Sequence, residues 1–188
     1  MSVAKNMSWK TIDTQMMVND YHVRVKKNKV QLPDGAEIDD FYTVTIPDAA
    51  MVCAVTAEGN ILLKSEYRYA CGEEVIECPA GMFEPDENDP LTVAKRELLE
   101  ETGYESDDWT YLGSTWESTS KLTNHMHLFL AKNAVKTSGQ HLDENEHLDV
   151  LSVKMADAVE MVMSGKINAN STAHLILKAD RILNGAKK

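Results

Sequence analysis

Three glutamates near the middle of the chain stand at a spacing that could do chemistry. Glu97, Glu100 and Glu101 occupy positions i, i+3 and i+4, so on a helix their carboxylates share one face. Two like charges about 4 Å apart cost on the order of 4 kcal/mol at an effective dielectric constant near 20, and a bound cation removes that cost. Hard divalent ions, Mg²⁺ above all, bind carboxylate and carbonyl oxygens and usually act together with substrate phosphates. The spacing therefore predicts a metal site, the alternative being a solvated acidic helix face.

The flanking residues predict the helix that carries these glutamates. Asp89 can serve as its N-cap, Pro90 suits its first position, and Gly103 lies where a left-handed residue ends a helix. Arg96 stands beside the glutamates, and we expect it to be structural, pairing with a nearby carboxylate.

The segment from Gly81 to Tyr104 resembles the Nudix box, G-x5-E-x7-R-E-U-x-E-E-x-G-U, where U is aliphatic or aromatic. The matching positions are Gly81, Arg96, Glu97, Leu98, Glu100, Glu101, Gly103 and Tyr104. The chain departs from the pattern by one extra residue between the first Gly and the Arg. Either Glu87 or Asn88 therefore holds the place of the first box Glu, which in the family mainly keeps the box Arg in position.

The resemblance extends from about residue 9 to about residue 178 and indicates one branch of the family. The runs that carry it are Glu66–Arg68, Glu77–Gly81, His127–Ala131 and Leu142–Val150. They are similar to the Q-Y-R, E-x-P-A-G, H-x-F-L-A and D-E-x-E-x-x-E-V runs of ADP-ribose pyrophosphatases and nucleoside-diphosphate-sugar hydrolases. These enzymes cleave a diphosphate linked to a sugar into a nucleoside monophosphate and a sugar phosphate. The implied fold class is α+β, a Nudix α/β/α sandwich with a mixed sheet plus an N-terminal antiparallel β-sheet.

The reaction that the resemblance implies gives candidate residues their roles. Cleaving a P–O–P linkage needs charge neutralised on both phosphates and a water delivered in line, which metal ions on carboxylates provide. We expect Mg²⁺, with Mn²⁺ possible, on Glu97, Glu100, Glu101 and, by resemblance, the carbonyl oxygen of Ala80. Glu100 is also a catalytic candidate. Arg68 is predicted to neutralise phosphate charge, the alternative being a surface arginine at a strand edge.

The catalytic base is the least regular feature of the resemblance. Many family members carry S-P-G-x-x-x-E before H-x-F-L-A, and that Glu activates water. Here Asn124 stands in the Glu place, and an amide does not accept a proton at neutral pH. The nearest acidic run is Asp143–Glu146, so we expect Glu146, with Glu144 behind it, to act as metal ligand or base. The alternative is that this run is only an acidic loop.

Aromatic side chains could hold the nucleobase by stacking. Phe41, in the predicted N-terminal sheet, and Trp116 are the candidates for substrate binding. Each has the alternative of belonging to the core or to an interface.

Composition narrows the class of protein. The chain has 188 residues, 43% of them hydrophobic and 26% charged, as in soluble globular proteins. A net charge of −11 argues against binding to nucleic acid or to an anionic membrane. The three cysteines form no disulfide or metal-ligand pattern, and neither a signal peptide nor a long apolar run is visible. These features predict a cytoplasmic protein.

The elements that would position these residues follow from alternation and turn signals. Residues 1–48 are predicted to form an antiparallel sheet for dimerisation and substrate recognition, with a turn at Lys26–Lys29, and residues 49–188 the Nudix hydrolase domain. The domain's strands are expected at 51–56, 61–68, 75–78, 109–113, 127–131 and 148–154, and its closing helices at 156–164 and 171–183. Residues 1–48 have too little apolar sequence for a core of their own, and family members commonly exchange this sheet across a two-fold axis. We therefore expect a homodimer through it.

Two functions remain open at this point. The leading one is Mg²⁺-dependent hydrolysis of an ADP-ribose-type nucleoside diphosphate sugar. The alternative is a catalytically impaired Nudix-fold module that binds a nucleotide diphosphate as a sensor, a reading motivated by Asn124 and the lengthened box loop. The intact R-E-L-L-E-E run favours the enzyme, because a pure binder has no evident use for a complete metal cluster.

Overall fold

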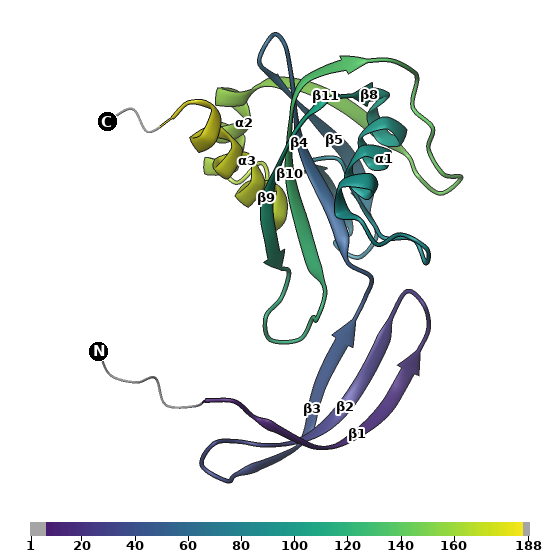
Figure 1. The fold of residues 1–188 in the computed structure, drawn as a ribbon, viewed down its shortest axis with the longest axis vertical. Helices are drawn as coiled ribbons and strands as arrows, with labels where there is room; N and C mark the ends of the chain where they lie inside the picture. The colour runs from purple at the N-terminus through teal and green to yellow at the C-terminus, as the bar shows by residue number, and fades with distance from the viewer. Residues whose placement is uncertain (1–6, 186–188) are drawn as a thin grey trace. The chain divides into compact units, whose positions relative to one another are not determined.

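The structure is a computed structural model that describes residues 7–185. Its contacts divide the chain into two units, most of whose elements are labelled in Figure 1. The N-terminal unit comprises the chain as far as Pro47 together with Ser118–Asn124. The main unit comprises Asp48–Glu117 and the chain from His125 onward.

The N-terminal unit is a three-stranded antiparallel sheet in the order β1-β2-β3. Its strands are β1 (Lys10–Asn19), β2 (Arg24–Gln31) and β3 (Glu37–Thr45). The predicted turn at Lys26–Lys29 is wrong, because β2 runs through these residues without a break. Asn28, which reads as a turn residue, instead connects the strands: its side chain is buried, accepts from Thr14 Oγ1 (2.9 Å) and donates to Thr43 Oγ1 (3.2 Å). A buried amide with its hydrogen bonds satisfied is stable within a sheet.

The main unit is built on an eight-stranded sheet. Its strands are β4 (Ala49–Thr56), β5 (Asn60–Arg68), β6 (Glu73–Glu77), β7 (Ala80–Met82), β8 (Tyr104–Glu105), β9 (Asp108–Trp116), β10 (His125–Lys136) and β11 (Leu148–Lys154). The order is β11-β5-β4-β10-β8, with β6 on β5, β7 on β4 and β9 on β10. Strands β4 and β10 pair in parallel and the other pairs are antiparallel, so the predicted mixed sheet is confirmed.

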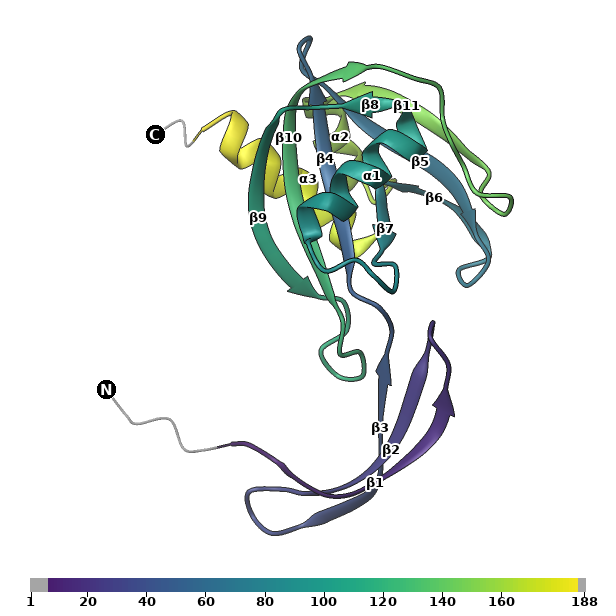
Figure 2. The ribbon, with the colours of Figure 1, turned by 45° about the vertical axis from the view of Figure 1, so that its right-hand side comes forward.

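Helices cover both faces of this sheet. Helix α1 (Pro90–Thr102) lies on one face, and α2 (Met155–Met163) and α3 (Asn170–Leu183) lie on the other (Figure 2). The predicted α/β/α layering is therefore confirmed. Among residues 7–185, no helix is both long and apolar enough to cross a bilayer.

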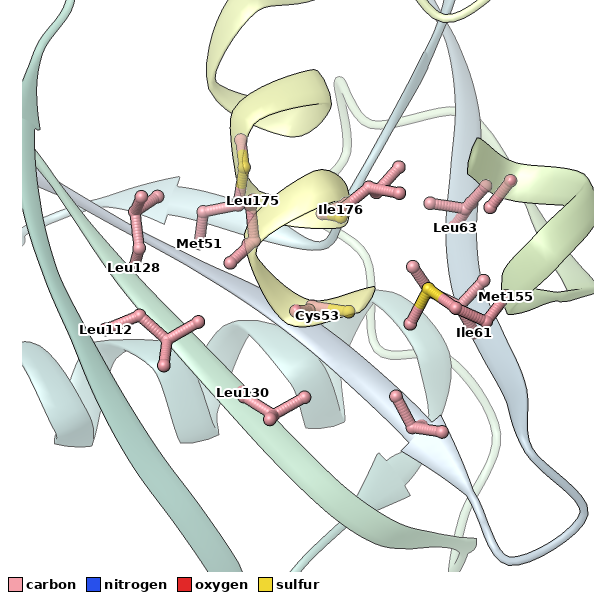
Figure 3. Packing of buried hydrophobic residues seen from close by; sticks show 14 of the residues in the cluster. Met51, Cys53, Ile61, Leu63, Leu112, Leu128, Leu130, Met155, Leu175 and Ile176 are labelled. Carbon is pink, nitrogen blue, oxygen red and sulfur yellow. The ribbon is translucent and has the colours of Figure 1, made fainter. Parts of the chain in front are cut away.

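Strand β4 contributes to the hydrophobic cores on both faces, and all of its residues are buried. Side chains alternate between the two faces of a strand. Met51 and Cys53 accordingly pack with α3 residues such as Leu175 (Figure 3), and Val52 packs with Leu98 of α1. A strand covered on both faces is expected to be continuously apolar, as this one is. Strand β7 pairs with β4, which fixes the short segment at Ala80 beneath helix α1.

Candidate active site

Helix α1 begins and ends as its sequence predicts. The carboxylate of Asp89 accepts hydrogen bonds from the backbone N–H groups of Leu91 (3.3 Å) and Thr92 (3.1 Å). At the other end, Gly103 adopts the left-handed conformation (φ 74°) and its N–H donates to Leu99 O (2.8 Å). These caps satisfy backbone groups that a helix end leaves unpaired, and so fix the register of the glutamates between them.

The three box glutamates do not share one environment. Glu97 and Glu101 point toward the sheet and are buried, Glu101 being 1% exposed. The side chain of Glu100 is 40% exposed at the rim of the helix. Two of the three carboxylates are therefore held away from water, and the third remains accessible.

Arg96 connects the box loop to the helix. Its Nε donates to Glu87 Oε1 (3.0 Å) and its Nη2 to Glu87 Oε2 (3.1 Å), a bidentate pair. Its Nη1 lies 2.9 Å from Glu100 Oε2 and 2.8 Å from Glu97 Oε1. Glu87, and not Asn88, therefore takes the place of the first box glutamate, and the extra loop residue comes after it. The expected structural role of the arginine agrees with these contacts.

The two buried glutamates converge on consecutive residues of β7. Glu101 Oε2 accepts a hydrogen bond from Ala80 N (3.0 Å). Glu97 lies so close to Gly81 that a Cβ at this glycine would collide with its carboxylate. The box glycine is thus required because the carboxylate occupies the space of a side chain. The structure brings together three of the predicted ligands: Glu97, Glu101 and Ala80.

Lys64 is a member of this cluster that the sequence reasoning missed. It lies on β5, its side chain is 2% exposed, and its Nζ donates to Glu101 Oε1. The same Nζ lies 3.4 Å from Ala80 O and 3.5 Å from Glu66 Oε2. The sequence offers only a weak signal: Lys64 directly follows the apolar run Ile61–Leu63 on a predicted strand, and a lysine there is buried only if anionic partners meet it.

Arg68, at the end of β5, is held by two carboxylates. Its guanidinium lies 3.2 Å from Glu66 Oε2 and 2.7 Å from Glu77 Oε2. It also lines a surface cavity together with Glu117 and residues 168–172 at the beginning of α3. Glu66 contacts both Arg68 and Lys64, so Arg68 is connected to the glutamate cluster through one carboxylate.

Glu146 lies in the loop between β10 and β11. Its backbone N–H donates to Asp143 O (3.0 Å) and its Oε2 accepts from Asp143 N (3.1 Å), which closes a turn that also contains the exposed Glu144. Glu146 lines a cavity with Glu66 and Tyr67, and among the described residues none of the α1 glutamates lines it. The structure therefore places Glu146 near the Glu66 end of β5, not in the cluster on α1.

The remaining predicted positions are not gathered at this cluster. Trp116 lies at the end of β9, and its ring centroid is 3.9 Å from that of His125. Phe41 belongs to the N-terminal unit, where its ring meets Trp9 edge-on (5.4 Å between centroids) and Lys121 Nζ lies 4.5 Å from its centroid. Trp116 is 50% exposed and Phe41 is partly buried, so neither ring belongs to a buried core.

Comparison with known proteins establishes the family. The NUDIX domain matches residues 45–174 of the chain. The chain belongs to the Nudix family. It is 32% identical over 173 residues to the ADP-ribose pyrophosphatase of Bacillus subtilis (strain 168), covering 92% of each protein. It is 32% identical over 164 residues to the methanol dehydrogenase activator of Bacillus methanolicus, covering 87% of this chain and 88% of that protein.

Two further similarities agree with this assignment. The GDP-mannose pyrophosphatase of Escherichia coli (strain K12) is 30% identical over 130 residues, or 64% of this chain and 66% of that protein. The crystal structure of an ADP compounds hydrolase superposes with a TM-score of 0.82 at 18% identity, covering 98% of this chain and 99% of that one. The structural likeness shows the fold, and the family assignment makes the protein a Nudix hydrolase. Nudix hydrolases generally use a divalent metal ion.

The box glutamates and the β7 segment beside them offer oxygen donors, which such an ion requires. Across residues 7–185, no three His, Cys, Asp or Glu side chains converge as a preformed metal centre. Cations of the protein contact these carboxylates: Arg96 binds Glu97 and Glu100, and Lys64 binds Glu101. Two buried carboxylates that face one carbonyl segment nevertheless form a hard oxygen donor set, which fits Mg²⁺ or Mn²⁺.

Burial makes the two inner Nudix glutamates unusually weak acids. Burial raises the pKa of Glu97 to about 7, and the positive charges of Arg96 and Lys64 oppose this shift only in part. Burial likewise raises the pKa of Glu101 to about 7, against the opposing effect of Lys64. Both pKa values lie above the ordinary 4.5. The contribution of these two raised pKa values to the free energy of unfolding is therefore fully present below about pH 4.5 and is lost as the pH rises through about 7.

The same pKa values predict how metal affinity depends on pH. A divalent ion binds the ionised carboxylates, so protons compete with it wherever Glu97 and Glu101 titrate. We expect affinity for Mn²⁺ to fall at least about tenfold between pH 8 and pH 6. Isothermal titration calorimetry in buffers of matched ionic strength would measure it. An affinity that stays constant over this range would contradict the assignment of these two glutamates as ligands.

Proposed function

We propose that the protein hydrolyses the diphosphate linkage of a nucleoside diphosphate sugar of the ADP-ribose type, giving a nucleoside monophosphate and a sugar phosphate. The observation that carries this proposal is the convergence of the Glu97 and Glu101 carboxylates on Ala80 and Gly81. Two relatives, named as an ADP-ribose pyrophosphatase and a GDP-mannose pyrophosphatase, support the substrate class.

The roles follow from the positions of the donor atoms. Mg²⁺, with Mn²⁺ as a substitute, would be held by Glu97, Glu101 and the carbonyl oxygen of Ala80, with Glu100 at the exposed rim. The ion supplies charge neutralisation on the diphosphate and activation of the attacking water. Arg68 lines a cavity while held by two carboxylates, so its guanidinium is fixed in position to receive a phosphate oxygen.

Proton transfer is assigned to accessible carboxylates. Glu100 is half-exposed and Glu146 lines the cavity beside Glu66, so water can reach both carboxylates. Glu146 is proposed as metal ligand or base because it lines a cavity with Glu66, whose carboxylate contacts both Lys64 and Arg68. Asn124, in the place where many relatives carry the base, is buried. Trp116 in the main unit and Phe41 in the N-terminal unit are proposed as separate candidates for stacking on a nucleobase.

The N-terminal sheet is proposed to form a homodimer. Strand β1 is exposed along its whole length and carries apolar side chains that a partner would cover, namely Ile12, Met16, Met17 and Val18. Such an exposed apolar strand is typical of an interface. We expect a dimeric mass by light scattering at micromolar concentration. A monomeric mass at that concentration would contradict the proposal.

A panel of diphosphates would test the proposed function. Purified protein with Mg²⁺ is offered ADP-ribose, GDP-mannose, UDP-glucose and a dinucleoside polyphosphate, and kcat/KM is measured for each. We expect the highest kcat/KM for a sugar diphosphate, because the relatives that support the proposal are named as pyrophosphatases of ADP-ribose and GDP-mannose. Preference for the dinucleoside polyphosphate would contradict the proposed substrate class.

The alternative of a nucleotide-binding sensor is favoured by one observation. Asn124 is buried, and among the described residues no hydrogen bond reaches its Oδ1. A buried amide in the usual place of the base cannot activate water. Saturable binding of ADP-ribose by calorimetry, with Mg²⁺ and Mn²⁺ each present and no product formed, would establish the sensor in place of the enzyme.

A further inference from the structure

The position of Lys64 within β5 directs its side chain at the glutamate cluster. Alternate residues of a strand share a face, so Leu62, Lys64 and Glu66 point the same way. Leu62 packs in the hydrophobic core beneath α1 together with Leu98. Lys64 is the next residue of this row, so its side chain extends past the apolar core and its ammonium group meets Glu101.

The ammonium group is surrounded by oxygens that suit a cation. Its Nζ contacts Glu101 Oε1, Ala80 O at 3.4 Å and Glu66 Oε2 at 3.5 Å. An ammonium group has three donors, and here it meets three oxygen acceptors. Two of these three residues, Glu101 and Ala80, are also proposed ligands of the divalent ion. The ammonium group of Lys64 thus contacts the same residues that are proposed to bind the divalent ion.

The charges around the Lys64 ammonium group indicate that it supplies a buried positive charge at the glutamate cluster. Lys64 is almost completely buried, as is Glu101, so each needs the other to offset its loss of hydration. Where two metal ions act on a phosphate, they clamp its oxygens from neighbouring positions about 3.5–4 Å apart. An ammonium group on one of these positions supplies positive charge there without a second ion. The other lone pairs of the Glu101 carboxylate are then left for a single ion, together with Glu97, whose Oε1 also lies 2.8 Å from Arg96 Nη1.

We propose that Lys64 is a built-in cation that replaces one divalent ion of the active site, so that the protein binds one fewer ion than its carboxylates would otherwise hold. This inference rests on the proposed metal site at Glu97 and Glu101. It adds that the electrostatic role of a second ion is performed by a side chain of β5. Lys64 is a positioning residue in this view, since it acts through Glu101 and Ala80.

Counting bound ions tests this directly. The full chain and its Lys64→Met variant are titrated with Mn²⁺, and free Mn²⁺ is measured by electron paramagnetic resonance. Met has a similar length without the charge, so we expect the variant to bind one more Mn²⁺ per chain than the wild type. Lys132→Met is the matched control, because Lys132 lies on β10 and pairs with Asp108 at 3.0 Å on the surface. Equal numbers of bound ions in wild type and Lys64→Met would overturn the proposal.

A second measurement on the wild type removes any dependence on the folding of the variant. In ¹H–¹⁵N NMR of the lysine NH₃⁺ groups, the buried Lys64 should give a signal protected from exchange with water. We expect this signal to persist when Mg²⁺ is added to saturation. Its loss would overturn the proposal, because the ion would then displace the ammonium group.

Neither readout requires turnover, so the two proposals fail in different ways. An extra ion in Lys64→Met without cleavage of any diphosphate would uphold Lys64 as the built-in cation and reject the proposed reaction. Cleavage of a diphosphate, with equal numbers of bound ions in wild type and Lys64→Met, would uphold the proposed reaction and reject Lys64 as the built-in cation. Absence of Mn²⁺ binding by either protein would overturn both proposals.

Discussion

Glu101→Gln is expected to lower kcat by at least about a hundredfold, the loss usual for an essential catalytic group. Glu101 is 1% exposed and its Oε2 accepts the Ala80 N–H at 3.0 Å. The amide keeps the size of the side chain and an acceptor for that N–H, but it removes the negative charge that binds a cation. The loss should therefore appear mainly as weaker metal binding and slower turnover, not as an altered fold.

The measurement is kcat at saturating substrate and Mg²⁺, together with Mn²⁺ affinity by calorimetry. Glu160→Gln is the matched control, because Glu160 is an exposed residue of helix α2, on the opposite face of the sheet. We expect unchanged kcat for this control. Far-ultraviolet circular dichroism would show whether Glu101→Gln still folds when Lys64 keeps only Glu66 as an anionic partner. Unchanged turnover in a folded Glu101→Gln protein would show that Glu101 is not a metal ligand.

Gly103→Ala is expected to lower the free energy of unfolding by about 2–5 kcal/mol. A left-handed backbone costs a non-glycine residue roughly 1–2 kcal/mol, and overpacking adds about 1–3 kcal/mol. Gly103 has φ 74°, and a Cβ at this position would collide with the backbone carbonyl of Ser138. That carbonyl has little freedom to move, because the N–H of Ser138 (3.2 Å) and that of Thr137 (2.9 Å) both donate to Gly103 O.

Urea denaturation of the metal-free protein would measure this loss. Gly59→Ala is the control that separates the two causes, since Gly59 has φ 79° and no atom within 4 Å of an added Cβ. We expect Gly59→Ala to lose only the backbone part, about 1–2 kcal/mol. Equal losses in both variants would show that the contact with Ser138 does not contribute. Because Gly103 follows the last turn of α1, we also expect Gly103→Ala to weaken metal binding.

The parts of the fold that the sequence predicted are those with local causes. Asp89 and Gly103 bound helix α1 through hydrogen bonds that span only three or four residues. Strand β4 is buried on both faces, so its apolar run is visible without knowledge of its partners. The box glutamates are equally local, because their shared helix face depends only on their spacing.

The parts that the sequence did not predict depend on distant partners or on exposure. Every residue of β1 is exposed, so the strand lacks the alternation between buried and exposed residues that predicts one. Lys64 meets Glu101 from a different element, 37 residues away, and its burial becomes interpretable only when that contact is known. The choice between Glu87 and Asn88 likewise required the contact with Arg96.

The measurement that tests the central claim most directly is a ³¹P NMR time course of purified protein with ADP-ribose, recorded with Mg²⁺ and again after chelation of the metal. If Glu97 and Glu101 form the metal site of a sugar diphosphatase, the two diphosphate signals will be replaced by two phosphomonoester signals, and only when metal is present. Diphosphate signals that persist with either Mg²⁺ or Mn²⁺, while ADP-ribose binds saturably, would contradict an enzyme of this class.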